Sequence, residues 1–469
     1  MLRLVDRARP ALAEGGTFDE AEHHALARRA AAESAVLLKN ESDVLPLKPA
    51  AGDTVAVIGE FARRPRYQGA GSSQVNPTKL DLPLDELQKA LGEQVEVRFA
   101  AGFMIGGEEG DKSEALRGEA VTLAGECDHV LVFLGLPSAA ESEGFDRTHI
   151  RLPANQLSLI DALAELGKPL VVVLANGSVV QLSTWEHKVA AILECWLSGQ
   201  AAGGAAADLL LGKANPSGKL AETVPLRLED NSSYLNFPGD PGVVRYGEGL
   251  FIGYRGYDKA DQPVSYPFGF GLSYTSFEIS DVEVGVSGSV AEDDLAVEVS
   301  ATVTNTGPVA GAEVVQVYVR DVESTVSRPI RELAGFAKVT VEPGESQTVT
   351  IGLAQRAFAF WSMQWNRWAV EAGEFEIAVG SSSRDLAATK TVTLDAPSLA
   401  APLGPDSTLQ EWLADERGRE LLFALDPQPP ILRDPELVSV IGTMPMATLA
   451  AFQGMSVDHA TLQRLLSEL

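Results

Sequence analysis

Residues 129–136 are HVLVFLGL and residues 169–177 are PLVVVLANG, two runs in which apolar side chains occupy successive positions. A strand with one face in water alternates apolar and polar residues, whereas a strand covered on both faces is apolar throughout. Three further candidate strands are VAVIGE (55–60), VAAILECWL (189–197), which is apolar except for Glu194, and VEVRFAAG (95–102), which also carries Glu96 and Arg98. These five segments predict a mainly parallel sheet with helices on both of its faces.

The segments between these strands have helical patterns. In residues 154–167 large aliphatic side chains recur every three residues, and Gly167 ends the pattern. Further helices are expected at 84–91, 111–126, 200–212 and, rich in alanine, 18–38. The alternation of strands and helices predicts an α/β sandwich over residues 40–225, preceded by a linker helix within residues 1–39.

The pattern changes after this α/β region. Residues 226–275 are rich in glycine, proline and aromatic residues without a helical period, so they predict an extended connection that wraps the surface. Residues 276–396 alternate apolar and polar positions between turn residues, which predicts an antiparallel β-sandwich. Residues 397–469 predict a linker and a short helical tail with pieces at 408–423 and 446–469. Core and edge positions of the β-sandwich are expected for Trp361, Trp365 and Trp368.

Charge and composition exclude several classes of protein. With 37 Lys and Arg against 65 Asp and Glu, the net charge of −28 repels phosphate backbones, so no nucleic-acid partner is expected. The chain has no apolar run of membrane-spanning length and no signal-peptide core, which predicts a cytoplasmic protein without membrane contact. Two cysteines and six histidines without paired spacing predict no metal site, and no cofactor is expected.

An acidic loop directly follows the strand at 129–136. Glu141, Glu143 and Asp146 lie within six positions, and Arg147 comes next. Loops at the end of buried strands commonly carry reactive groups, and neighbouring like charges raise the pKa of a carboxyl group. The loop therefore predicts a carboxylic acid suited to glycoside hydrolysis. The alternative is a solvated loop in which Asp146 and Arg147 pair to cap the next helix.

A second polar loop, YQGAGSSQVNP (67–77), follows the first parallel strand. It has no phosphate-binding glycine pattern, and its amide and hydroxyl groups match sugar hydroxyls. Gln68, Ser72 and Ser73 are therefore candidate substrate-binding residues, the alternative being a tight turn. The glycine- and aromatic-rich segments 247–257 and 267–274 are expected to pack one domain against another rather than to stack on sugars.

Taken together, these segments resemble the C-terminal part of glycoside hydrolase family 3, the β-glucosidase and β-xylosidase family. The resemblance covers roughly residues 25–395 and is carried by segments in unbroken order, among them AAAESAVLLKNESDVLPL, YQGAGSSQVNPTK, ESEGFDRTHIRLPANQ, SGQAAGGAAADLLLGKANPSGKL, GEGLFIGYRGYD, YPFGFGLSYTSF and RPIRELAGFAKVTVEPGES. It implies an α/β sandwich followed by a fibronectin type III-like domain. In the family an N-terminal (β/α)8 barrel precedes these domains, and no segment of this chain resembles that barrel.

The resemblance also implies a chemistry. Members are retaining hydrolases of terminal β-linked glucosides or related sugars, with an aspartate nucleophile on the barrel and an acid/base glutamate on a sandwich loop. The acid/base maps onto Glu143 or Glu141, with Glu143 favoured, and its carboxyl should lie about 5–5.5 Å from the nucleophile. The chain is then expected to be nearly inactive alone and to need a separate barrel chain, or to self-associate. Two alternatives are a non-catalytic carbohydrate-binding or scaffold protein, and a self-sufficient hydrolase that uses Glu141 and Glu143 together.

Overall fold

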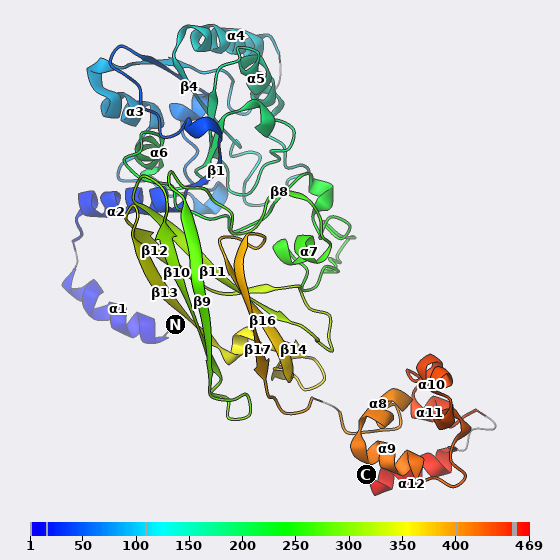
Figure 1. Ribbon diagram of the computed structural model, residues 1–469. Coiled ribbons are helices and arrows are strands. Elements are labelled where there is room, and N and C mark those ends of the chain that lie inside the picture. The colour runs from blue at the N-terminus through cyan, green and yellow to red at the C-terminus, as the bar shows by residue number, and fades with distance from the viewer. Residues whose placement is uncertain (1, 16, 108–109, 400, 453–456) are drawn as a thin grey trace. The chain divides into compact units, whose positions relative to one another are not determined.

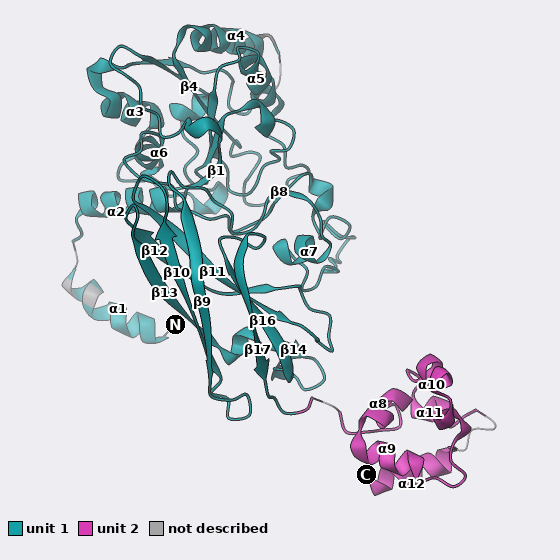
Figure 2. Cartoon of the chain, in the orientation of Figure 1, with its two compact units in different colours: residues 1–397 teal, residues 398–469 magenta. Residues whose placement is uncertain are grey.

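The computed structural model describes all residues except 1, 16, 108–109, 400 and 453–456. The chain forms two compact units, Met1–Pro397 and Ser398–Leu469 (Figure 2). Unit 1 contains an α/β sandwich and a β-sandwich, and unit 2 is helical (Figure 1). The predicted fold class is confirmed.

The α/β part of unit 1 is built on one six-stranded sheet. Its strands lie in the order β1-β6-β5-β4-β2-β3, and only β1 runs antiparallel to its neighbour. The strands are β1 (Val36–Asn40), β2 (Thr54–Ile58), β3 (Glu96–Ala100), β4 (His129–Gly135), β5 (Leu170–Ala175) and β6 (Ala191–Glu194). Because β2 to β6 are parallel, the loops that follow them leave from the same edge of the sheet.

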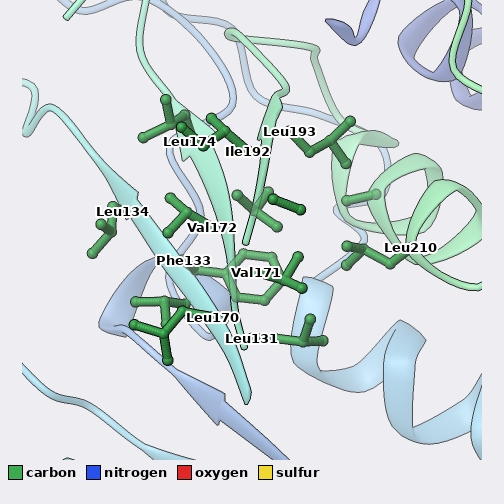
Figure 3. Close-up of a cluster of buried hydrophobic side chains, with 14 of the residues drawn as sticks. Leu131, Phe133, Leu134, Leu170, Val171, Val172, Leu174, Ile192, Leu193 and Leu210 are labelled. Carbon is green, nitrogen blue, oxygen red and sulfur yellow. The ribbon is translucent and has the colours of Figure 1, made fainter. Parts of the chain in front are cut away.

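Apolar residues of the sheet are buried beneath the helices. The helices of this part are α2 (Glu20–Ser34), α3 (Pro83–Leu91), α4 (Asp111–Glu126), α5 (Ala154–Ala164) and α6 (Ala202–Leu210). Figure 3 shows side chains of β4, β5 and β6 in the core, with Leu210 of α6 beside them. Leu131, Val172 and Leu193 have no accessible surface, so the centre of the sheet is closed to water on both faces.

The N-terminal region differs from its prediction. One helix was expected over residues 18–38, but α2 ends at Ser34 and the strand β1 begins at Val36. Val36 and Leu37 pair with β6. The backbone hydrogen bonds of this strand pair take the place of those that a continued helix would make. A further helix, α1 (Leu2–Glu14), precedes α2.

The connection at 226–275 is not extended throughout, contrary to its prediction. It contains the short helix α7 (Tyr254–Lys259) and the strand β8 (Val264–Tyr266), which pairs with β7 (Val224–Pro225). The hydroxyl oxygen of Tyr254, in α7, accepts the backbone N–H of Leu333 at 2.8 Å. The connection thus joins the two sandwiches of unit 1.

The β-sandwich of unit 1 has one sheet in the order β13-β10-β9 and one in the order β12-β11-β16-β17. The neighbouring strands within both sheets pair antiparallel. Its strands are β9 (Phe277–Ser287), β10 (Ala296–Asn305), β11 (Gly311–Asp321), β12 (Glu332–Val341), β13 (Ser346–Ala354), β16 (Gly373–Gly380) and β17 (Leu386–Leu394). Val303, Val317 and Phe375 are fully buried between the sheets.

The three tryptophans expected at core and edge positions of the β-sandwich are exposed and lie outside its core. They belong to a separate hairpin of β14 (Phe360–Ser362) and β15 (Arg367–Ala369) and to its turn. The exposed fractions are 42% for Trp361, 37% for Trp365 and 46% for Trp368. Valine, leucine and isoleucine from the seven long strands, with Phe358 and Phe375, fill the core without them.

Unit 2 packs short helices around the fully buried Trp412. The helices are α8 (Leu409–Ala414), α9 (Glu416–Phe423), α10 (Pro435–Ile441), α11 (Met446–Leu449) and α12 (His459–Glu468). The expected helix at 408–423 is divided at Asp415, whose side chain caps α9, and α10 was not predicted. Part of the expected piece at 446–469 lies outside the described residues. Among the residues described, no helix is long and apolar enough to cross a bilayer.

Candidate active site

The two polar loops singled out in the sequence meet at the edge where the parallel strands end. The acidic loop follows β4, the Gly/Ser loop follows β2, and residues 176–179 follow β5. Together they line an open pocket of about 470 Å³. Its polar lining includes Ser72, Ser73, Glu141, Ser142, Glu143 and Ser178.

Glu141 is bound to the loop after β5. Its carboxylate accepts the N–H of Gly177 at 2.7 Å and the N–H of Ser178 at 3.0 Å. Arg147 Nη1 lies 3.6 Å from one carboxylate oxygen and Arg66 Nη1 lies 3.8 Å from the other. The side chain is 11% exposed. Glu141 therefore joins the loops after β4 and β5.

Arg66 and Arg147 hold the same loops through backbone carbonyls. Arg66 donates to the carbonyls of Leu136 and Glu141 at 2.7 and 2.9 Å. Arg147 donates to Ser178 Oγ and to the carbonyl of Val179 at 3.0 and 3.1 Å. Arg147 does not help Asp146 to cap α5, because the N-cap of that helix is Pro153, which makes no side-chain cap. Neither loop-holding role was foreseen from the sequence.

Glu143 occupies the open side of the pocket and contacts a different loop. Its carboxylate accepts hydrogen bonds from the hydroxyl and from the backbone N–H of Ser72, the latter at 2.9 Å. These two donors hold the pKa of Glu143 below its usual value, the hydroxyl being the larger cause. The expectation that neighbouring carboxylates would raise the pKa is wrong for this residue, because the two Ser72 donors stabilise its ionised form.

The Gly/Ser loop brings two of its three candidate residues to the pocket. Ser72 and Ser73 line it, and Ser73 Oγ donates to the carbonyl of Ala70 at 3.2 Å. The side chain of Gln68 instead braces its own loop, since its amide exchanges hydrogen bonds with the backbone N–H and carbonyl of Val75. Gly71 has φ +80°, and a Cβ there would meet the Cβ of Glu143 at 2.8 Å, so glycine permits the close approach of the two loops.

Two carboxyl groups beneath the pocket do have raised pKa values. Burial raises the pKa of Glu194, at the end of β6, to about 8. Its oxygens accept the N–H of Trp196 and the side-chain amide of Asn176, both at 2.9 Å. Burial also raises the pKa of Glu222, against the attraction of Arg147. A glutamate inside the apolar run AILECWL was the available signal for Glu194.

Stability is therefore expected to fall with rising pH. Glutamate in an unfolded chain titrates near pH ~4.3, whereas folded Glu194 keeps its proton up to a pH of about 8. Between these values the folded state binds the extra proton, so the free energy of unfolding decreases as the pH rises. Glu194→Gln has no such proton to lose, and we expect it to raise the melting temperature at pH 8.5 and to reduce the difference between pH 5 and pH 8.5.

Thermal melts followed by circular dichroism would check this expectation. Glu93→Gln, at an exposed position, is the matched control. An equal fall between pH 5 and pH 8.5 in Glu194→Gln and in the parent chain would contradict the role given to Glu194.

Comparison with known proteins shows the family to which the chain belongs. The model of the glycosyl hydrolase family 3 C-terminal domain matches residues 35–274. The chain belongs to glycosyl hydrolase family 3. The model of the fibronectin type III-like domain matches residues 313–383, within the β-sandwich of this family 3 chain.

Similar proteins include a β-glucosidase and an arabinopyranosidase. The chain is 49% identical to thermostable β-glucosidase B of Acetivibrio thermocellus, covering 84% of the chain and 51% of the relative. It is 47% identical to an exo-α-(1→6)-L-arabinopyranosidase of Bifidobacterium breve, covering 91% of the chain and 56% of the relative. The crystal structure of a Bifidobacterium adolescentis family 3 β-glucosidase aligns with a TM-score of 0.83 at 49% identity, over 90% of the chain and 60% of that structure. The chain thus spans between half and two thirds of the length of these relatives.

Proposed function

We propose that this family 3 chain is the acid/base-bearing part of a retaining hydrolase that removes terminal β-linked glucosyl residues. The observation that carries the proposal is the placement of Glu143, an exposed carboxyl on the wall of a polar pocket at the carboxyl edge of the sheet. The identity of 49% to a β-glucosidase supports glucosides as the substrate class. The arabinopyranosidase similarity makes a pentopyranoside the nearest competing substrate.

In the proposed mechanism Glu143 acts twice. A nucleophilic carboxylate attacks the anomeric carbon, the glycosidic C–O bond breaks, and the proton of Glu143 passes to the departing oxygen. The Glu143 carboxylate then takes a proton from the water that attacks the same carbon, which releases the sugar and restores both groups. Ser72 and Ser73 offer hydroxyls to the sugar, and Gln68 acts indirectly by holding the shape of its loop.

Glu143 is preferred over Glu141 because their contacts differ. An acid/base must reach the substrate and exchange protons with it. The Glu143 side chain is exposed, and one of its carboxylate oxygens accepts both hydrogen bonds from Ser72. In Glu141, by contrast, each carboxylate oxygen accepts a backbone N–H. The Ser72 hydrogen bonds favour the ionised form of Glu143, so substrate must replace them before Glu143 can donate its proton. We assign Glu141 to positioning of the loop.

The nucleophile is proposed to come from a (β/α)8 barrel. Among the described residues that line the pocket, the carboxyl groups are those of Glu141 and Glu143, and Glu141 is engaged as above. A partner surface is available in the connection, where large apolar side chains are exposed between Tyr234 and Ile252. Leu235 is 92% and Tyr246 82% exposed, and such a concentration of apolar surface is typical of protein contact sites.

The proposal is tested by complementation. The 469-residue chain alone is expected to release no p-nitrophenol from p-nitrophenyl β-glucoside above the level of a Glu141→Gln/Glu143→Gln double variant. Co-expression with the part of the Acetivibrio thermocellus relative that this chain does not cover, which we expect to contain the barrel, is expected to restore release. The product of this co-expression is here called the complemented enzyme. Release by the chain alone that disappears in the double variant would contradict the proposed external nucleophile.

A further inference from the structure

The hairpin β14–β15 concentrates exposed tryptophan. Three of the six tryptophans of the chain lie within residues 361–368, each more than a third exposed. By contrast, Trp185 and Trp412 are 1% and 0% exposed. Burying a large aromatic ring is favourable, so leaving several exposed has a free-energy cost. A cluster of exposed rings on one hairpin therefore indicates a binding surface. The proposed hydrolytic chemistry uses none of these residues.

The tryptophan rings contact one another and neighbouring arginine side chains. Trp361 and Trp368 are opposite each other in the β14–β15 register, so they stand on the same face of the hairpin. Their centroids are 5.3 Å apart in an edge-to-face arrangement. The Arg356 guanidinium lies over the Trp368 ring, and that of Arg367 lies 6.0 Å from the centroid of Trp365. A preformed aromatic surface loses little conformational entropy when a ligand binds.

The side chains near the three tryptophans indicate whether the ligand is neutral or charged. Residues 355–369 contain two arginines and three amide side chains. They contain no aspartate or glutamate, although the chain as a whole has 65 of these residues. The hairpin is therefore rich in hydrogen-bond donors and free of carboxylates. A neutral hydroxylated ligand meets no repulsion from the net charge of −28, whereas a polyanion is repelled by the remaining surface.

We propose that the hairpin surface formed by Trp361, Trp365 and Trp368 binds a neutral β-linked glucan chain. The axial C–H groups of a pyranose present a weakly positive face that matches the negative face of an indole ring. Arg367 and the amides of Gln364 and Asn366 can donate to the hydroxyls at the ring edges. The choice of a glucan among neutral glycans rests on the proposed function. The inference that the hairpin binds a neutral glycan is independent of that function.

The surface is distinct from the candidate active site. In Figure 1 the hairpin labelled β14 lies at the end of unit 1 opposite to α4 and α5. The acid/base pocket lies at the carboxyl edge of the sheet that α4 and α5 cover. Binding at the hairpin would therefore keep the protein on a polysaccharide while chain ends are processed elsewhere.

Affinity gel electrophoresis in barley β-glucan tests the proposal. All proteins carry Glu143→Gln, so retention is measured without turnover, and a failure of hydrolysis is a separate result. The parent is expected to be retarded, and Trp361→Ala/Trp368→Ala is expected to weaken binding at least about tenfold. Phe336→Ala, which removes a 66% exposed aromatic ring from β12, is the matched control and should bind as the parent does.

Three results would overturn the inference. The first is equal retardation of the tryptophan variant and the parent in β-glucan. The second is retardation of the parent in polygalacturonate alone, which added salt abolishes. The third is that the parent is a dimer in the absence of glucan and the tryptophan variant is a monomer. The second result would identify an acidic glycan and the third a second copy of the chain. If the double variant does not fold, Trp361→Ser alone provides the same comparison at an exposed position.

Discussion

Replacing Glu143 by glutamine is expected to slow cellobiose hydrolysis by the complemented enzyme about 10²–10⁴-fold, the usual contribution of a positioned acid/base. Glutamine keeps the size of the side chain and can still accept from Ser72, but it has no proton to give to the departing oxygen. The loss should be much smaller in the first step with 2,4-dinitrophenyl β-glucoside, because that leaving group departs without protonation. Steady-state rates on the two substrates, with a burst measurement for the aryl glucoside, check this expectation.

Glu141→Gln is the matched control for this experiment. It removes a carboxyl two residues away but leaves the proton donor, so its rates on the two substrates should change by similar factors. A large loss confined to cellobiose in Glu141→Gln, with none in Glu143→Gln, would reverse the assignment of the two residues.

Replacing Glu141 by alanine is expected to destabilise the α/β sandwich strongly. The change leaves the N–H groups of Gly177 and Ser178 without their acceptor and leaves Arg66 and Arg147 without their carboxylate. Breaking a buried charged pair from one side costs about 3–5 kcal/mol, and this corresponds to a fall in melting temperature of roughly 6–20 °C for a domain of this size.

Differential scanning calorimetry of the 469-residue chain checks this second expectation without a barrel partner. Glu143→Ala is the control, because the Glu143 side chain is exposed and its carboxylate accepts hydrogen bonds from the equally exposed Ser72, so the melting temperature should hardly change. Equal melting temperatures for Glu141→Ala and Glu143→Ala would contradict the positioning role of Glu141.

The sequence was sufficient to predict β2, β4, β5 and β6, because these apolar runs are buried on both faces, whereas the edge strand β3 is partly exposed. The helix expected at 111–126 is α4 with the same bounds. The strand β1 was missed because VLLKN follows an alanine-rich helical segment without a glycine or proline between them. Only its pairing with β6 separates the two elements, and that pairing is a tertiary contact.

The acidic loop was located from the sequence, but the different partners of its two glutamates were not. Residues two apart in an extended segment point the same way, and this rule predicted a shared environment for Glu141 and Glu143. The loop is instead held by hydrogen bonds of Arg66 and Arg147 to backbone carbonyl groups that are distant from these arginines in sequence. No local sequence pattern predicts such contacts. The burial of the three tryptophans was predicted wrongly for a similar reason. The residue type alone does not determine whether a hairpin packs on the core or lies outside it.

The most direct test of the central assignment is the product formed by the Glu143→Gln complemented enzyme from 2,4-dinitrophenyl β-glucoside in the presence of azide. Azide attacks a glycosyl-enzyme without help from a base, so it should restore turnover and give the β-glucosyl azide expected of a retaining enzyme. The assignment predicts this product from Glu143→Gln and not from Glu141→Gln. Azide product from Glu141→Gln alone, or from neither variant, would contradict the assignment of Glu143 as the acid/base of this chain.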